Sequence, residues 1–317
     1  MNKLKTFTDK ESQCRYLFQN AAKEVGPFWH ICTPGTAQEI INITEDDYKF
    51  SVNNLAISAL EENVIILTDA HMENHLHALM GGPKERCLAV LDRFRARLKR
   101  YLHNSGRFVD LRFFRCDDPI PVDTLEAVRN EIAYINRNGY VVNPDYLPFS
   151  YPWGGGFLYF NPPAQRLSGI SYNTIPFRVR RKMCLSRVSE LPENYLVLDK
   201  MIQPVCYVHF ALGESMFRDA HHYLYQVTKN FEAYSEEAKR LGDRVIVSRD
   251  ELFSIVQLLS KRDYNIAQPA LLPTAAKLEI ARTIHSQYNA SNAQIRSLLK
   301  LPEQEVNALF PLKTLPR

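Results

Sequence analysis

The chain has 317 residues, of which 45% are hydrophobic and 23% are charged, and its formal net charge is +4. This composition is typical of a globular protein with enough apolar material for a sizeable core. The sequence contains no apolar run of about 18 residues, which excludes a membrane span, and the polar N-terminus predicts no secretory signal. Six scattered cysteines without a Cys-x-x-Cys pair argue against a zinc ribbon and a disulfide framework. We therefore expect reduced thiols and a cytoplasmic protein.

Strand-like and helical segments alternate over the first 138 residues. Runs of aromatic and β-branched residues predict strands, and apolar side chains at helical spacing predict helices. The expected elements are a helical lead-in over 1–25, strands over 28–33 and 107–114, two strands and a turn within 64–80, and helices over 44–60, 84–102 and 124–138. Their order is β-α-β-β-α-β-α. It predicts an α+β fold, namely a ferredoxin-like β-α-β-β-α-β sandwich with an added helix after the last strand.

The second half of the chain is expected to be mostly helical. Glycine, proline and aromatic residues over 139–165 predict a loop that packs against the domain, and 166–247 is mixed. A short strand at 245–247 and a capping box at Ser248 precede a helix that ends near 261. Three short helices after 271 resemble a helix-turn-helix, and a plain three-helix module for dimerisation or packing is the alternative. The predicted domains are 1–160, 161–265 and 266–317.

Two histidines on one predicted strand, His75 and His77, are the first candidate site residues. Side chains alternate along a strand, so both imidazoles point the same way and resemble half of a metal site. Taken alone, the pair is more simply explained as part of a sheet surface. Tyr134 and Asn138 lie four residues apart on a predicted helix and therefore share a face. Gly139 is expected at the C′ position, which puts Asn138 at the helix end.

These residues resemble the HUH single-tyrosine transposases. The segment Asn74-His75-Leu76-His77 matches the His-hydrophobic-His motif of that family. Tyr134, with Asn138 four residues later, is similar to the family's nucleophile helix. Tyr151-Pro152-Trp153 is similar to the Pro-Trp that follows this helix in the REP-associated branch. The resemblance covers residues 27–155.

The resemblance implies a metal-dependent endonuclease and strand transferase that acts on single-stranded DNA. His75, His77 and Asn138 would hold Mg²⁺ or Mn²⁺, and Tyr134 would attack the phosphate to form a 5′-phosphotyrosine. The expected partner is single-stranded or hairpin DNA rather than a membrane, and a homodimer is one option for the assembly. The alternative is a domesticated protein that binds hairpin DNA without cleaving it.

Two basic clusters and one further arginine are expected to contact the DNA backbone, although a solvated helix face explains each cluster equally well. The predicted DNA-binding residues are Arg93, Arg95, Arg97, Arg100, Arg137, Arg178, Arg180 and Arg181. Either His30 or His71 could support a ligand, but we expect both to be structural, because neither matches the family motif. Gly139 stands where the REP-associated branch typically has proline. Residues 160–317 have no counterpart in the minimal catalytic domain, which favours a host-associated branch.

Overall fold

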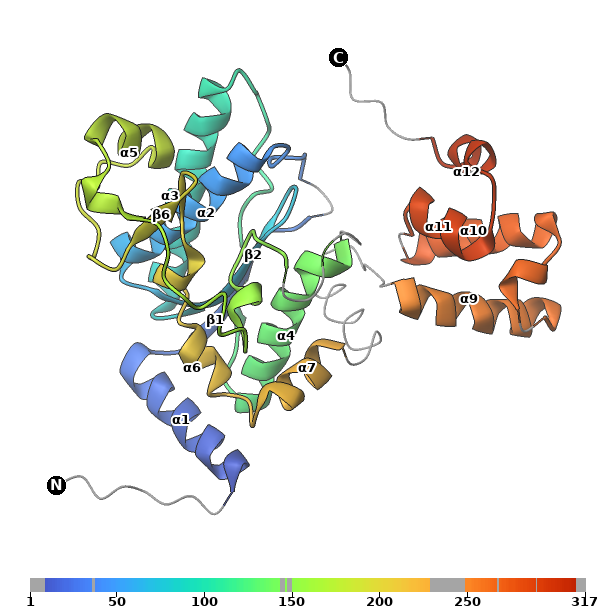
Figure 1. Ribbon diagram of the computed structural model, residues 1–317, viewed down its shortest axis with the longest axis horizontal. Coiled ribbons are helices and arrows are strands. Elements are labelled where there is room, and N and C mark those ends of the chain that lie inside the picture. Colours follow the sequence, from blue (N-terminus) through green and yellow to red (C-terminus); the bar gives the residue numbers. More distant parts are fainter. Residues whose placement is uncertain are drawn as a thin grey trace. The chain divides into compact units, whose positions relative to one another are not determined.

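A computed structural model describes residues 9–35, 38–142, 146, 150–228, 249–266, 268–288 and 290–311. The chain divides into two compact units, Met1–Lys229 and Asn230–Arg317, which are coloured blue to yellow and orange to red in Figure 1. The fold is α+β, with antiparallel sheets among many helices. Among the described residues, the helices are all too short or too polar to cross a membrane.

A four-stranded antiparallel sheet forms the centre of the first unit, in the order β2-β3-β1-β4. Its strands are β1 (Phe28–Cys32), β2 (Ile65–His71), β3 (Leu76–Gly81) and β4 (Ile120–Pro121). The register sets Cys32 opposite His77. Paired residues point to the same side of a sheet, so this register decides which side chains meet on each face.

The strand predicted over 107–114 is wrong, because none of these described residues belongs to a strand and the fourth strand is the shorter β4. The segment is a series of turns, in which Asp110 accepts a hydrogen bond from the Arg112 backbone at 3.0 Å. Two of its apolar residues enter the core: Leu111 and Phe114 are buried, and Phe114 stacks on Phe94. Phe108 and Phe113 are exposed, so the apolar residues of this segment indicate neither an extended backbone nor uniform burial.

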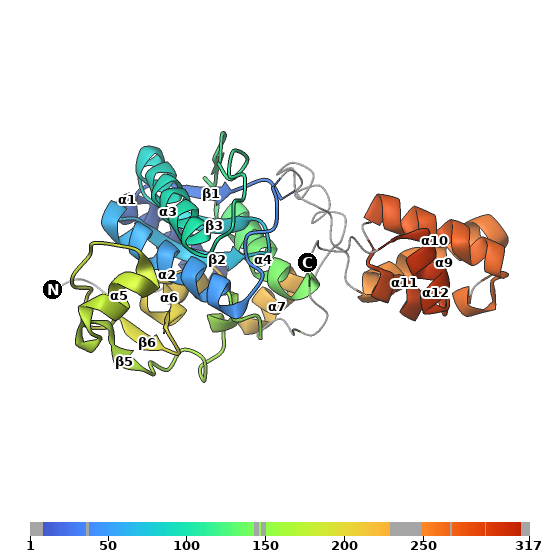
Figure 2. The same cartoon turned by 90° about the horizontal axis from the view of Figure 1, so that it is seen from above.

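Helices cover both faces of the central sheet (Figure 1; Figure 2). Helices α2 (Glu45–Glu62) and α3 (Lys84–Asn104) pack on one face, where Ile31, Ala78 and Met80 join their apolar core. Helix α4 (Leu125–Val142) packs against β2 and β3 on the other face. His30 and His77 alternate with the core residues along their strands, so they point toward α4.

Helix α2 begins at the predicted cap, where Thr44 and Asp47 form a capping box. The outer side of α2 is buried by elements that lie later in the chain than the central sheet and α4. They comprise α5 (Phe177–Cys184) and a three-stranded sheet of β5 (Ile170–Ser171), β6 (Leu196–Leu198) and β7 (Met201–Ile202). Asn53 of α2 donates to the Lys200 carbonyl at 2.8 Å and accepts from the Ile202 amide at 2.6 Å. Residues 161–228 thus form part of the first compact unit.

Helix α4 is longer than predicted, because it continues through Gly139 to Val142 instead of ending at Asn138. The glycine serves close packing and not helix termination. A Cβ on Gly139 would lie 2.4 Å from a ring carbon of Tyr151. The loop that carries Tyr151 packs as expected, since Trp153 is buried and stacks on Tyr48 with ring centroids 5.0 Å apart.

The remaining helices of the first unit are α1 (Lys10–Val25), α6 (Phe210–Glu214) and α7 (Ala220–Thr228), with 3-10 turns at Gly156–Leu158, Tyr172–Thr174 and Pro204–Cys206. The second unit contains α9 (Arg249–Tyr264), a 3-10 turn at Pro269–Leu271, α10 (Thr274–Tyr288), α11 (Asn292–Leu299) and α12 (Glu303–Leu309). The three predicted tail helices are present, and Ser291 caps α11 with a capping box. The predicted strand at 245–247 and the cap at Ser248 lie outside the described residues.

Candidate active site

Three of the predicted site residues meet on the α4 face of the central sheet. The rings of His75 and His77 lie edge to face, with centroids 5.0 Å apart. The Tyr134 ring meets His77 in the same way, at 5.4 Å. His77 is fully buried and Tyr134 is 5% exposed, whereas His75 is half-buried at the edge of the cluster. Segments about sixty residues apart thus supply two imidazoles and one phenol to a single cluster.

Asn74 orients the His75 ring. Its side-chain NH₂ donates to the carbonyls of Gly35 at 2.7 Å and Gln38 at 2.9 Å. These bonds aim its amide oxygen at His75 Nδ1, 2.8 Å away. A ring nitrogen that faces an amide oxygen carries the proton, so Nε2 of His75 is the nitrogen with a lone pair for a metal.

His30 belongs to the same cluster, although we expected it to be structural from its place in the sequence. His30 Nε2 lies 3.1 Å from His77 Nδ1, and the Glu131 carboxylate lies 2.6 Å from His30 Nδ1. If His77 held a metal through Nε2, its Nδ1 would carry the ring proton and donate a hydrogen bond to His30 Nε2. The negative charge of the Glu131 carboxylate beside His30 Nδ1 would favour the tautomer that is protonated there. Such carboxylate and imidazole rows fix the tautomer and the orientation of ligand histidines.

One part of this row could be found from the sequence. Glu131 precedes Tyr134 by three residues on α4 and therefore shares its face. The other part could not, because His30 reaches His77 only through the pairing of β1 with β3. The same pairing of β1 with β3 places Cys32 directly opposite His77.

The two other predicted residues on α4 are buried. Asn138 is 2% exposed and lies one helical turn after Tyr134, on the same side of the helix. Its ligand role stays a prediction. Arg137 is 4% exposed, so its side chain belongs to the interior and not to an open basic surface.

Helix α4 is tied to three neighbouring elements, and this fixes the position of Tyr134. Asn136 accepts a hydrogen bond from the Thr68 hydroxyl on β2 and donates to the Tyr223 hydroxyl on α7 at 3.0 Å. Near the start of the helix, Arg129 holds both carboxylate oxygens of Glu11 on α1 at 3.0 Å. A bidentate pair of this kind fixes orientation as well as distance.

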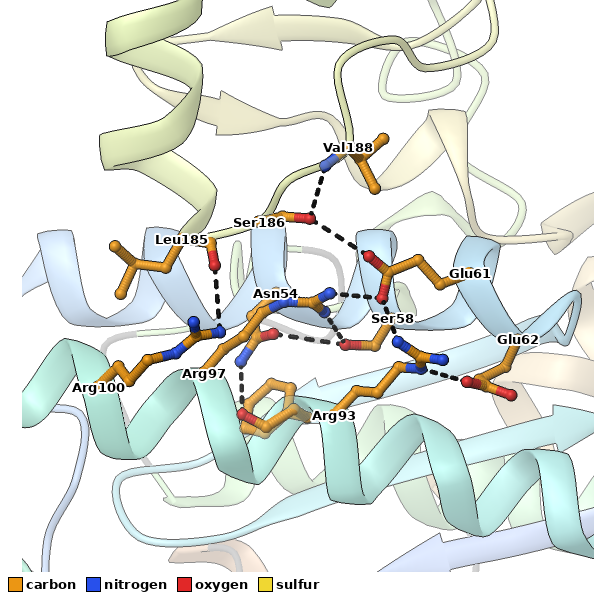
Figure 3. Close-up of polar contacts among 11 residues, drawn as sticks. Asn54, Ser58, Glu61, Glu62, Arg93, Arg97, Arg100, Leu185, Ser186 and Val188 are labelled. Carbon is orange, nitrogen blue, oxygen red and sulfur yellow. Dashed lines mark hydrogen bonds and ion pairs between the residues drawn. The ribbon is translucent and has the colours of Figure 1, made fainter.

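The predicted DNA-binding arginines of α3 lie on the opposite side of the sheet from Tyr134 and bind protein groups there. Figure 3 shows the contacts of Arg93, Arg97 and Arg100. Arg97 is buried, donates to the Ser58 hydroxyl at 2.8 Å and pairs with Glu61. The other three are less buried: Arg93 pairs with Glu61 and Glu62, Arg95 with Asp92, and Arg100 donates to the Leu185 carbonyl. The contacts of Arg93 and Arg97 join α3 to the acidic end of α2, and that of Arg100 joins it to the end of α5, whereas the pair of Arg95 lies within α3.

The arginines of α5 differ from one another in their surroundings. Arg178 and Arg181 are exposed. Arg180 lies over the Tyr172 ring, with its guanidinium carbon 5.3 Å from the centroid, and it donates to the Ser189 carbonyl. Because α5 packs on α2, all three belong to the same side of the sheet as α3.

His71 lies on the α2 and α3 face, away from His77. Its Nε2 is 3.1 Å from the buried Asp69 carboxylate, which also accepts a hydrogen bond from Tyr207 at 3.1 Å. Burial raises the pKa of Tyr207 well above its ordinary value of 10.0, so the phenol stays protonated and keeps donating. This contact joins β2 to the segment after β7 and agrees with a structural His71.

Comparisons with known proteins do not assign the chain to a family. No protein-family model, curated protein or solved structure matches the chain.

Proposed function

We propose that the protein is a metal-dependent single-stranded DNA endonuclease and strand transferase that acts through Tyr134. One observation carries the proposal: the imidazoles of His75 and His77 and the phenol of Tyr134 converge in one cluster. The element order and the strand order β2-β3-β1-β4 also suit a ferredoxin-like sheet of the kind that the sequence resemblance implies.

The donor atoms fit a divalent ion. His75 and His77 each have one nitrogen oriented by a neighbour, so that the other nitrogen can bind a metal, and Asn138 would add an amide oxygen. A mixed nitrogen and oxygen set with open positions suits Mg²⁺ or Mn²⁺. When bound, the ion would polarise the scissile phosphate and stabilise the leaving 3′ oxygen.

The chain's own groups supply the nucleophile and its position. The Tyr134 oxygen would form a bond to phosphorus while the bond to the 3′ oxygen breaks, which leaves a 5′-phosphotyrosine and a 3′-OH. Attack by a 3′-OH would reverse this step and rejoin the strand. Asn136 and Arg129 hold the helix, and Glu131 and His30 orient His77.

Single-stranded or hairpin DNA is the substrate that we propose. Arg178 and Arg181 are exposed and remain candidates for phosphate contact, but they belong to the α2 side of the sheet. They would hold DNA that flanks the cleavage point and not the scissile phosphate itself. Arg97 is excluded from this role, since it is buried in the interface between α2 and α3.

The second candidate function is hairpin binding without cleavage. The observation in its favour is the burial of Tyr134, which is 5% exposed. A nucleophile must reach within bonding distance of its phosphate, so cleavage requires the DNA to enter the cluster.

A nicking assay separates the two functions. The full chain would be incubated with labelled hairpin oligonucleotides with single-stranded flanks and with Mn²⁺ or Mg²⁺. We expect a covalent protein–DNA adduct that resists denaturing gel electrophoresis and maps to Tyr134, and we expect Tyr134→Phe to lack it. Tyr172→Phe is the matched control, because Tyr172 is also a buried tyrosine but lies beside α5. Hairpin binding with no adduct in the wild type would establish the second function.

A further inference from the structure

We propose that His30, Cys32 and His77 form a second metal site, which binds Zn²⁺ and competes with the Mg²⁺ or Mn²⁺ site for His77. This inference deepens the proposed function, and its competitive part rests on that function. The site itself rests on the side chains alone. The three potential ligand atoms of these residues all lie within 4.8 Å of one another.

The pairing of β1 with β3 builds the group. Cys32 is the direct partner of His77, and His30 lies two residues earlier on β1, so all three side chains point to the α4 face. His30 and His77 are fully buried and Cys32 is half-buried, which leaves the thiol side as the way in for an ion. Cys32 is not in a disulfide.

The spacing suits a tetrahedral ion. His30 Nε2 and His77 Nδ1 are 3.1 Å apart, whereas two nitrogens on one tetrahedral Zn²⁺ with bonds of about 2.0–2.1 Å lie about 3.3 Å apart. A small outward movement of one ring therefore suffices. Glu131 stands behind His30 Nδ1 at 2.6 Å, which is the carboxylate–histidine arrangement that supports zinc ligands.

The donor set decides which metal is favoured. A thiolate with two imidazoles is softer than the set of His75, His77 and Asn138, and it prefers Zn²⁺ to Mg²⁺ or Mn²⁺. On binding, the Cys32 thiol gives up its proton to solvent and the thiolate bonds to the ion. A fourth position remains for water.

The two sites exclude each other through the tautomer of His77. Zn²⁺ would take the lone pair of Nδ1, so the single ring proton of His77 moves to Nε2. That nitrogen then has no lone pair for an ion held with His75. Zinc binding would also replace the contact between His77 and His30 that orients His77 for the proposed reaction.

Cobalt tests the site without any activity measurement. Co²⁺ would be titrated into the full-length protein, because a thiolate bound to Co²⁺ gives a charge-transfer absorption that imidazole and carboxylate ligands do not give. We expect this absorption in the wild type, its removal by added Zn²⁺, and its loss in Cys32→Ser. Cys116→Ser is the matched control, since Cys116 is the other half-buried cysteine, and it should keep the absorption. Circular dichroism would check that both variants are folded.

The outcomes are separate from those of the nicking test. An absent absorption in the wild type, or one that persists in Cys32→Ser, would overturn the zinc site. If the protein nicks DNA with Mn²⁺, we expect Zn²⁺ to inhibit the wild type and Cys116→Ser but to lose its effect on Cys32→Ser. Equal inhibition of all three proteins would overturn the competition. A protein that shows the absorption but forms no DNA adduct would keep the zinc site and lose the proposed nuclease.

Discussion

Replacing Gly139 with alanine should destabilise the protein, even though alanine is the better helix former. In an open helix the exchange would stabilise by about 1 kcal/mol. Here the new Cβ would lie 2.4, 2.5 and 2.8 Å from three carbon atoms of Tyr151, against about 3.5–4.0 Å for a favourable carbon contact. The ring cannot simply swing away, because its hydroxyl donates to the His71 carbonyl.

Overpacking of this severity costs about 2–3 kcal/mol. After the gain in helix propensity is subtracted, we expect a net loss of about 1–2 kcal/mol in the free energy of unfolding. For a unit of this size the loss lowers Tm by about 2–8 °C.

Calorimetry of four full-length proteins would measure this effect: the wild type, Gly139→Ala, Tyr151→Gly and the double variant. Tyr151→Gly removes all three contacting atoms, so in that background the same alanine should raise stability by about 1 kcal/mol. The change of sign is the signature of the contact. If alanine stabilises the protein in both backgrounds, Tyr151 does not pack on Gly139 of α4 and our account of this glycine is wrong.

Four further predictions test other parts of the structure. Arg97→Met should lower the free energy of unfolding by about 2 kcal/mol in urea unfolding, because it breaks a buried ion pair with Glu61. Arg95→Met should change it by less than about 0.5 kcal/mol, because the ion pair of Arg95 with Asp92 is exposed to solvent. Burial raises the pKa of Asp47, but hydrogen bonds from the helix start and from Tyr101, together with Arg107, outweigh it and hold the pKa below its ordinary 3.8. The charged form therefore stabilises the folded state, and the stability advantage over Asp47→Asn should be complete above pH 3.8 and be lost as the pH of the unfolding experiment falls from there through the lower pKa of the folded state. Glu131→Gln should weaken Mn²⁺ binding by about 10–100-fold in calorimetric titration, because Glu131 orients His30, which in turn orients His77. An unchanged affinity would show that His30 does not orient His77 for the metal. Ser291→Ala should cost the second unit about 1 kcal/mol and leave the unfolding of the first unit unchanged.

Local signals in the sequence were sufficient for most helices. The capping boxes at Thr44 and Ser291 and the apolar spacing that follows them predict α2 and α11 correctly, because a cap and a helical face involve residues three or four apart. The position of His75 and His77 beside Tyr134 also follows a recognisable motif, although their roles stay predictions.

Signals that depend on a distant partner were misleading or absent. The segment 107–114 has the residues of a strand but finds no sheet partner and becomes a series of turns. Gly139 resembles a helix terminator, yet it lies inside α4, where the absence of a side chain lets the Tyr151 ring pack against the helix. The arginines of α3 resemble a DNA-binding face, but Arg93 and Arg97 pair with the acidic end of α2.

The sequence by itself therefore determined the order of β1, α2, β2, β3, α3 and α4, the starts of these helices and the pair of histidines at the start of β3, since each depends on neighbouring residues. Only the tertiary structure decided that His30 contacts His77, because these residues are 47 positions apart and meet through the strand register. The same register brings Cys32 to His77 and so creates the metal site that we propose. A sequence pattern specifies which chemistry a residue can perform, whereas packing and register specify which partner it meets.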